Sequence, residues 1–538
     1  MRLLLCLLQS GWFILLSTPS HSQHATDVAA FLPTARTFVS ASQLAESINS
    51  SELRTHLEIL ASDQYEGRET GTTGQRKAAL YLARAFSSFG LPAVGIDGSY
   101  LQPILFKSEN WQKIDLRIEG KSARHLWDYY ALPGSNGDSR YLAFDEIFFL
   151  GYGIDSEKYT DYRGQNFKDK AILIFEGEPV SKEGEYLLTG TEQPEGWTIE
   201  KKLRTAKKYG VEVVFVIDRN FRKELSTARK IVLDTHLKTD TDGESTDLPY
   251  NIHISSSLAK DIIGGKYKKL INIRKRMDNR GVSRPLRLDS RIDLEMIKDV
   301  KLVQGENVLG YIEGSDPDIS DELVVLTAHY DHLGKRGENI YYGADDNASG
   351  TAALLEICQA FSLAAQNGWA PRRSLLFLFV SGEDKGLLGS RFYTENPVFP
   401  LENTIANLNV DMIGRVDERH KGRPNYVYII GSDRLSQELH RINESANDAY
   451  TGLELDYTYN QGDDANRYYY RSDHYNFAVR GIPSIFYFSG PHEDYHRITD
   501  TKEKINYEKV EKIARLVFHT AWELVNRDER IKLDERNK

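Results

Sequence analysis

Hydrophobic residues recur every three or four positions in two stretches near the start of the chain, 51–60 and 74–89. This spacing places the apolar side chains on one face of a helix, so it predicts two amphipathic helices. A loop rich in glycine and threonine separates them. No strand-like run lies beside these helices, and we therefore expect both to pack on a sheet that is built further along the chain.

The pattern changes between residues 111 and 291, where short apolar runs of strand length dominate. Examples are residues 146–150, 171–175 and 211–217, and a helical stretch at 198–209 separates the last two. Such runs, divided by polar segments, are typical of short buried strands. We predict a small β-rich domain here.

After residue 303, strand-length apolar runs alternate with helical stretches. The runs are 323–327, 374–380, 405–410, 426–430 and 484–488. This alternation predicts a mixed, mostly parallel sheet flanked by helices on both faces. The predicted fold class is therefore α/β, with residues 23–110 and 296–538 forming one domain and residues 111–295 inserted between its two parts.

Composition excludes several classes of protein. The chain has 538 residues, of which 40% are hydrophobic and 11% aromatic, and this is too apolar for a disordered chain. The formal net charge is −10, which argues against nucleic acid or an anionic membrane as the main partner. The sequence predicts a folded, acidic, multidomain protein.

Residues 1–22 have the pattern of a secretory signal peptide. A charged start, Met1-Arg2, precedes an interrupted apolar run over residues 3–16, and small residues follow at Ser20 and Ser22. The run is too short to be a good membrane span. We expect an exported protein, periplasmic or secreted, that has no membrane span after cleavage near Ser22.

Reactive side chains follow the predicted strands at their carboxyl ends. His329 and Asp331 follow the first strand of the α/β part, Glu383 and Asp384 the second, and Asp411 the third. Two further polar segments contribute: 343–350 lies between the first two strands, and 492–496 follows the last strand, 484–488. Because the carboxyl ends of parallel strands share one sheet edge, these groups should converge. Imidazoles and carboxylates without a thiolate suit Zn²⁺ or a similar divalent ion.

Six motifs, in this order along the chain, resemble those of peptidase family M28, the co-catalytic zinc exopeptidases that include secreted bacterial aminopeptidases. Residues 67–71 also resemble the family's N-terminal signature, and the middle block resembles a protease-associated domain. The resemblance covers nearly the whole chain after residue 22 and implies the zinc-exopeptidase fold. The six motifs are Thr327-Ala328-His329-Tyr330-Asp331-His332, residues 343–350, Gly382-Glu383-Asp384, Asn409-Val410-Asp411, Ser472-Asp473-His474 and Asp494-Tyr495-His496.

The resemblance also implies a set of metal ligands. Asp345 would bridge two Zn²⁺ ions, or other divalent ions, and a cis peptide would follow it at Asp345–Asp346. His329 and Asp411 would complete one site, and Asp384 and His496 the other. Asp384 stands where many family members have glutamate, and its side chain is one methylene shorter.

Four further residues receive roles from the same resemblance. Glu383 would be the general base that takes a proton from water. Tyr495 would donate a hydrogen bond to the developing oxyanion, and Asp331 would orient the imidazole of His329. Arg471, just before Ser472, is a candidate for substrate contact, with a surface salt bridge as the alternative.

A competing motif overlaps the last segment. Residues His492-Glu493-Asp494-Tyr495-His496 match the H-E-x-x-H pattern of single-zinc proteases, which requires both histidines on one face of a helix. Gly490-Pro491 before the motif and Asp500 after it leave little room for a long helix. This interpretation also leaves Glu383 and Asp411 without a role.

The sequence thus predicts a metallo-exopeptidase that acts on peptides. The family resemblance favours an aminopeptidase, with carboxypeptidase or dipeptidase action as alternatives. Glutaminyl cyclisation on one zinc fits less well, because ligands for two ions are present. An alternative from another class is a receptor-like binding protein that has lost catalysis, but none of the expected ligands and no base is missing.

Overall fold

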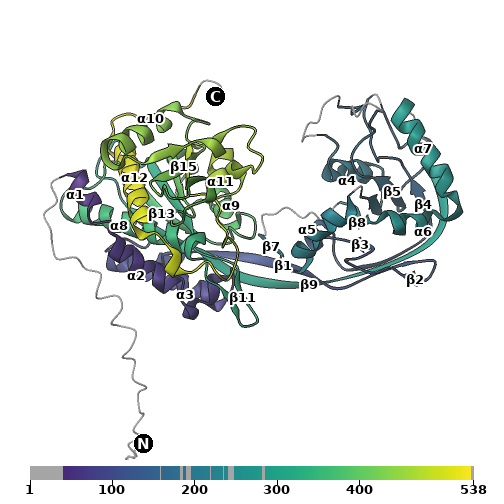
Figure 1. Ribbon diagram of the computed structural model, residues 1–538, viewed down its shortest axis with the longest axis horizontal. Coiled ribbons are helices and arrows are strands. Elements are labelled where there is room, and N and C mark those ends of the chain that lie inside the picture. The colour runs from purple at the N-terminus through teal and green to yellow at the C-terminus, as the bar shows by residue number, and fades with distance from the viewer. Residues whose placement is uncertain are drawn as a thin grey trace, which may run out of the picture.

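The computed structural model shows two lobes joined by long strands (Figure 1). It describes residues 40–157, 159–181, 186–189, 196–218, 220–233, 236–239, 248–280 and 285–534. The predicted signal peptide, residues 1–22, lies outside the described residues.

The larger lobe contains a mixed sheet with the strand order β16-β15-β17-β14-β10-β13-β9. Its four central strands, β17, β14, β10 and β13, are parallel to one another. The flanking strands β15 and β9 run antiparallel to their neighbours β17 and β13, and β16 lies outside β15 at the edge. This confirms the predicted α/β fold with a largely parallel sheet. The strands are β9 (Leu286–Ile312), β10 (Leu323–His329), β13 (Ser374–Val380), β14 (Thr404–Val410), β15 (Tyr426–Ile430), β16 (Glu454–Asp456) and β17 (Ser484–Phe488).

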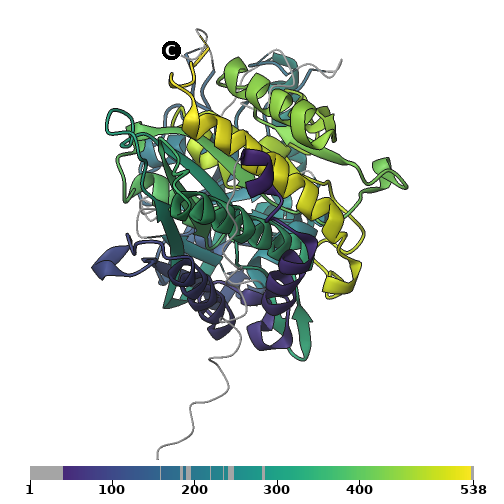
Figure 2. The ribbon, with the colours of Figure 1, turned by 90° about the vertical axis from the view of Figure 1, so that its left-hand side faces the viewer.

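Helices cover both faces of this sheet. On one face α2, α8 and α12 contact one another, and Figure 2 shows α8 and α12 running side by side. Alternate residues of each strand point to opposite faces, so Leu375 packs into this layer while Leu376 packs under α9 and α11. The helices are α1 (Ala41–Ala45), α2 (Ser50–Leu60), α3 (Thr73–Ser88), α8 (Gly350–Gln366), α9 (Leu388–Glu395), α10 (Gln437–Ala446), α11 (His474–Val479) and α12 (Tyr507–Asn526); a small hairpin is formed by β11 (Gly334–Arg336) and β12 (Asn339–Tyr341).

The smaller lobe differs from the predicted β-rich domain. Its strands β4, β5, β6 and β8 are parallel, and four helices, α4 to α7, pack around them. Only α4 was expected, and α5, α6 and α7 were missed, although α5 and α6 also have an amphipathic pattern. The elements are β2 (Lys121–Ser122), β3 (Tyr129–Tyr130), β4 (Arg140–Phe149), β5 (Ala171–Phe175), α4 (Ile199–Lys208), β6 (Val213–Ile217), α5 (Phe221–Leu233), β7 (His236–Thr239), β8 (Tyr250–Ile254), α6 (Ser256–Ile263) and α7 (Tyr267–Arg280).

Two long antiparallel strands connect the lobes. Strand β1 (Leu101–Ile118) pairs with β9 from Leu101↔Val308 to Ile118↔Ile292, with an irregularity between Trp111 and Lys113. Each lobe has its own apolar core, since one cluster has all its buried members between Leu116 and Met296 and the largest cluster has none there. The long ribbon therefore runs from one core to the other.

One helical stretch in the described part of the chain, Ala344–Gln366, is long and apolar enough to cross a membrane. Of its most apolar window, 89% is buried inside the molecule. It contains α8, which packs between the sheet and α12. Its apolar character fits a core helix.

Candidate metal centre

The reactive side chains converge at the carboxyl edge of the parallel strands. His329 is the last residue of β10, Glu383 and Asp384 follow β13, and Asp411 follows β14. His496 lies in the loop after β17, and residues 344–349 form a tight turn that leads into α8. The convergence predicted from the strand pattern is thus confirmed by the fold.

Asp346 occupies the centre of this group. One of its carboxylate oxygens lies 3.3 Å from Nε2 of His329, and the other lies 3.0 Å from Nε2 of His496. Its side chain is 4% exposed. The backbone N–H groups of Asp345 and Asp346 donate to the carboxylate of Asp500, at 3.1 and 3.2 Å, which fixes the turn.

Asp345, the predicted bridging residue, has different surroundings. Its carboxylate accepts a hydrogen bond from the Gly414 N–H at 2.5 Å and lies 3.3 Å from Nε2 of His492. The expectation was therefore wrong by one residue, because the turn directs the side chains of adjacent residues in different directions. The cis peptide is likewise one position later than predicted, at Asp346–Asn347.

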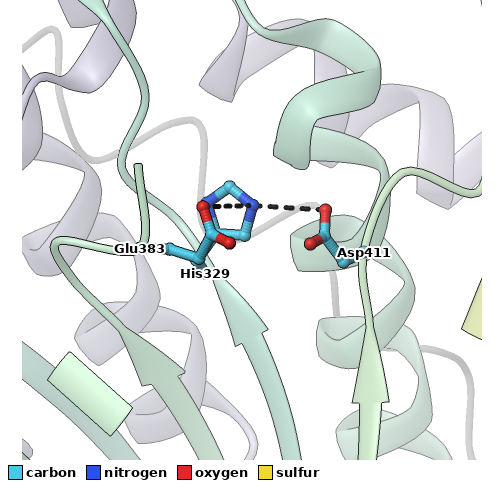
Figure 3. Close-up of side chains that lie close together, drawn as sticks. All are labelled: His329, Glu383 and Asp411. Carbon is cyan, nitrogen blue, oxygen red and sulfur yellow. Dashed lines mark hydrogen bonds and ion pairs between the residues drawn. The ribbon is translucent and has the colours of Figure 1, made fainter. Parts of the chain in front are cut away.

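His329 lies between two acids at the sheet edge (Figure 3). Its Nε2 is 3.2 Å from Oδ1 of Asp411 and 4.0 Å from Oε2 of Glu383. Asp411 also accepts a hydrogen bond from the Ser472 hydroxyl at 2.7 Å, and this holds its second oxygen. The predicted pairing of His329 with Asp411 is present in the geometry.

The other nitrogen of His329 contacts Asp331, but through the backbone. Nδ1 donates to the Asp331 carbonyl oxygen at 3.2 Å, whereas the Asp331 carboxylate is 3.8 Å away. The carboxylate instead accepts from the Thr70 hydroxyl at 2.6 Å. Because a carbonyl only accepts, Nδ1 carries a proton, and Nε2 is the nitrogen that faces the carboxylates of Asp346 and Asp411.

Asp384 and His496 form the other half of the centre. Oδ1 of Asp384 lies 3.1 Å from Nε2 of His496, and Oδ2 lies 3.0 Å from Nδ1 of His332. His332 had no predicted role, although it stands in the first motif. Its spacing of three residues from His329 and its place at a strand end are the signals that sequence reasoning passed over.

Burial and charge act against each other in this cluster. Burial alone would raise the pKa of Asp346, but His332, His329 and His496 outweigh it and lower the pKa well below its usual value. Burial would lower the pKa of His496, but contacts with Asp346 and Asp384 raise it to about 10. In Glu383, burial raises the pKa well above its usual value, and the nearby Asp411 and Asp384 carboxylates act in the same direction. These opposite shifts are typical of functional sites.

The donor set fits divalent cations. The ligand atoms of His329, Asp346 and Asp384 lie within 4.8 Å of one another, and so do those of His329, Glu383 and Asp411. Oδ2 of Asp346 and Nε2 of His496 are buried and close together, yet neither has a hydrogen-bond partner among the described residues. Several carboxylates buried together are costly unless cations pair with them. Nitrogen and oxygen donors in this arrangement suit Zn²⁺.

A small cavity opens beside the centre. Asp346, Glu383 and Asp411 form its polar end, and Tyr495 and Arg471 also line it. The guanidinium carbon of Arg471 lies 5.0 Å from the ring centroid of Tyr468. The remaining wall is apolar and consists of Met412, Tyr468, Phe486, Phe488 and Pro491. A peptide end group placed here would meet both the acids and the arginine.

The H-E-x-x-H interpretation is wrong. Residues 493–496 form a turn and no helix is present over residues 492–497, so the two histidines do not share a helix face. His492 contacts Asp345, whereas His496 contacts Asp346 and Asp384. The spacing of this motif is therefore coincidental.

Arg68 is a further residue without a predicted role. Its side chain is fully buried and donates to the carbonyl oxygens of Leu60, Tyr330, Tyr342 and Gly343 at 2.7 to 2.9 Å. These bonds tie the loop after β10 and the turn before α8 to the N-terminal segment. Burial lowers the pKa of Arg68 to about 10, and Asp331 and Asp346 oppose this shift. The loop 67–71 thus holds in place the two segments that carry the centre's side chains, the loop after β10 and the turn before α8.

Comparison with known proteins identifies the larger lobe. Residues 307–521 match the sequence profile described as peptidase family M28. This part of the chain belongs to peptidase family M28. The M28 region contains every residue of the centre described above from His329 to Asp500, while Arg68 and Thr70 come from the preceding segment.

Similarity extends beyond the M28 region in one structural comparison. The fold is similar to that of an aminopeptidase from Aneurinibacillus sp. strain AM-1, with a TM-score of 0.57 and 18% identity over 91% of this chain and 98% of that chain. Among curated sequences, a probable leucine aminopeptidase of Trichophyton verrucosum is 28% identical over 42% of this chain. A probable glutamate carboxypeptidase of Zea mays is 36% identical over 21% of it. The matches span 60% and 15% of these two relatives.

Proposed function

We propose that this protein is a metallo-aminopeptidase that holds two zinc ions and removes N-terminal residues from peptides. The observation that carries the proposal is the position of Asp346, whose two oxygens lie 3.3 Å from His329 and 3.0 Å from His496. A carboxylate that faces one imidazole on each side is suited to bridge two cations. Asp346 thereby takes the role that Asp345 was expected to have.

Each ion would have three protein ligands. His329, Asp346 and Asp411 would hold the first ion, and Asp346, Asp384 and His496 the second. When bound, the two ions lower the pKa of water and stabilise negative charge on the substrate oxygen. Three ligands per ion leave room for water, as catalytic zinc sites require.

The residues around the ions would move the protons. Glu383 is next to the ligand Asp384, and its Oε2 lies 4.0 Å from Nε2 of His329, so it stands beside the first site. It would take a proton from the attacking water at this carboxylate and deliver it to the leaving amine. Tyr495 lines the same cavity, and its hydroxyl would donate to the oxygen that becomes negative.

Two features support an aminopeptidase among metallopeptidases. Part of the cavity wall is apolar, formed by Met412, Phe486, Phe488 and Pro491, which suits the side chain of a terminal residue, and the acids of the cavity can attract an ammonium group. A curated relative is named a probable leucine aminopeptidase. Arg471 favours carboxypeptidase action as the second candidate, since a guanidinium can bind a terminal carboxylate.

A panel of aminoacyl chromogenic amides, free and N-acetylated, tests the proposal. We expect cleavage of the free amides only, complete loss with a chelator and recovery with Zn²⁺. Glu383→Gln should lower kcat by about 100-fold or more, because it removes the general base, whereas the exposed Glu493→Gln should leave it unchanged. Equal cleavage of acetylated amides would overturn the aminopeptidase assignment. Loss of activity in Glu493→Gln alone would overturn the role of Glu383.

We also propose that the protein is exported and that residues 111–295 form a protease-associated domain. The support is the pattern of residues 1–22 and the resemblance of the middle block to such domains. N-terminal sequencing of the native protein checks cleavage near Ser22, and an intact Met1 in the purified protein would contradict export by this signal.

A further inference from the structure

His332 contributes a third imidazole to the centre, in the half that contains Asp384. The two carboxylate oxygens of Asp384 face different histidines: Oδ1 lies 3.1 Å from His496 and Oδ2 lies 3.0 Å from Nδ1 of His332. The same Nδ1 is 3.7 Å from Asp346. Of these contacts, the one with Asp384 has the distance of a good hydrogen bond.

The ring of His332 is held tightly in place. It is fully buried, and its backbone N–H donates to the Arg68 carbonyl oxygen at 3.2 Å. A Cβ added at Gly343 would lie 2.5 Å from two ring carbons of His332, so the backbone there passes directly over the ring. A ring packed in this way has little freedom to turn its nitrogens elsewhere.

Hydrogen bonding also decides which nitrogen carries the proton. Nε2 is buried and has no hydrogen-bond partner within the described residues. A proton on Nε2 would therefore be a buried donor without an acceptor, which is costly. A proton on Nδ1 has the Asp384 oxygen 3.0 Å away. The tautomer with Nδ1–H donating to Asp384 is the favourable one.

We propose that His332 is a positioning residue that orients Asp384 for the second zinc ion. Its Nδ1–H would fix Oδ2, so that Oδ1 points beside His496 toward the ion. The aspartate has only two side-chain torsions, and a bond to one oxygen sets the direction of the other. Hydrogen bonds to ligating carboxylates are a general means of orienting them. This inference rests on the two-zinc centre proposed above.

Substitution of His332 by Asn, Leu or Ala distinguishes the positioning role from a purely structural role and from direct coordination of zinc. The Asn side-chain nitrogen can take the place of Nδ1 and donate to Asp384, whereas Leu has the same branched shape but no donor. An amide nitrogen is not a zinc ligand, so Asn also separates positioning from direct coordination. His519→Leu is the matched control, because His519 is 5% exposed on α12 and contacts Tyr450, not the metal centre.

Zinc affinity is measured directly on the full chain. Each metal-free protein is titrated with Zn²⁺ against a chromophoric chelator, and bound zinc is counted by mass spectrometry. We expect His332→Leu and His332→Ala to bind one ion as the parent does and the other about 10–100-fold more weakly. His332→Asn should bind both ions with nearly the parent's affinity, and His519→Leu should do the same. Circular dichroism of the metal-free proteins checks that each variant is folded, and two donor-free variants are used in case one is not.

Two results would overturn the role of His332. Both ions could bind to a folded donor-free variant with the parent's affinity, or His332→Asn could lose the second ion as completely as His332→Leu. A parent protein that takes up fewer than two ions would overturn the two-zinc centre itself. This last result is recognised from the parent alone, so it is distinct from a failure at position 332.

Discussion

At the residue scale, two adjacent carboxylates have different tasks. Asp346 lies between His329 and His496, while Asp345 lies against His492 and accepts the Gly414 N–H. Both are fully or almost fully buried. In the proposed centre the first would bind cations, whereas the second joins the turn before α8 to the loops after β14 and β17.

This difference predicts opposite phenotypes for the two amide variants. Asp346→Asn should remove zinc binding and lower kcat/KM by more than about 100-fold, because even the loss of a residue that only orients a ligand costs about 10–100-fold. Asp345→Asn keeps an oxygen for the Gly414 N–H and should retain zinc. It should lose about 1–3 kcal/mol of stability, since a hydrogen bond to a charged group is weakened.

Zinc counting, kinetics with an aminoacyl amide and urea unfolding of both variants provide the comparison. The parent protein without metal is the reference for stability. Should Asp345→Asn lose zinc while Asp346→Asn keeps it, the bridging position would return to Asp345 and the assignment made from the structure would be wrong.

At the element scale, the turn 344–349 and the start of α8 are fitted closely to strand β14. The Asn347 amide donates to the Val410 carbonyl oxygen at 3.0 Å and accepts from the Met412 N–H at 3.1 Å. Gly350 begins α8 in contact with the same carbonyl group. Since Asp411 follows Val410, this packing sets the distance between Asp346 and Asp411.

Gly350→Ala tests this close approach. A Cβ at Gly350 would overlap the Asn347 side-chain oxygen and the Val410 backbone oxygen, although the backbone conformation itself is helical. We expect a loss of about 1–3 kcal/mol, as for other overpacked positions, and weaker zinc binding. Gly265→Ala is the control, because no atom lies within 4 Å of its Cβ position and its φ is not positive.

Thermal and urea unfolding of the metal-free variants measure the difference. Gly265→Ala should be neutral or stabilising by up to about 1 kcal/mol, because alanine restricts the unfolded chain. Equal stability of the two variants would show that the turn can move away from β14, and the close packing would then not be needed for the centre.

The strand patterns predicted the strands that carry the centre. Which of the neighbouring polar residues face the centre depends on local backbone geometry. The apolar runs 374–380, 426–430 and 484–488 coincide with β13, β15 and β17, because a fully buried strand leaves a continuous apolar run. The helices α5, α6 and α7 were missed: α6 is short, and α5 and α7 contain many charged residues among their apolar ones. Asp346 and His332 were missed because adjacent or closely spaced polar residues differ only in where the backbone points them.

At the scale of the whole molecule, the chain forms two apolar cores on one continuous ribbon. Strands β1 and β9 run from the larger lobe to the smaller, and β9 pairs with β13 at one end and with β4 at the other. The residues of the metal centre and the loop 67–71 that contacts it all lie in the larger lobe. Cation binding should therefore stabilise one core and leave the other nearly unchanged.

Calorimetric unfolding should show this as two transitions that respond differently to zinc. Lobes with separate cores often unfold independently, and free Zn²⁺ at about 1,000 times its dissociation constant adds about 4 kcal/mol to the lobe that binds it. We expect a chelator to lower one transition temperature only. In Asp346→Asn, both transitions should lie where the chelated parent has them. A single transition that moves as a whole with zinc would mean that the β1–β9 ribbon couples the two cores into one cooperative unit, and the smaller lobe would then sense the metal centre directly.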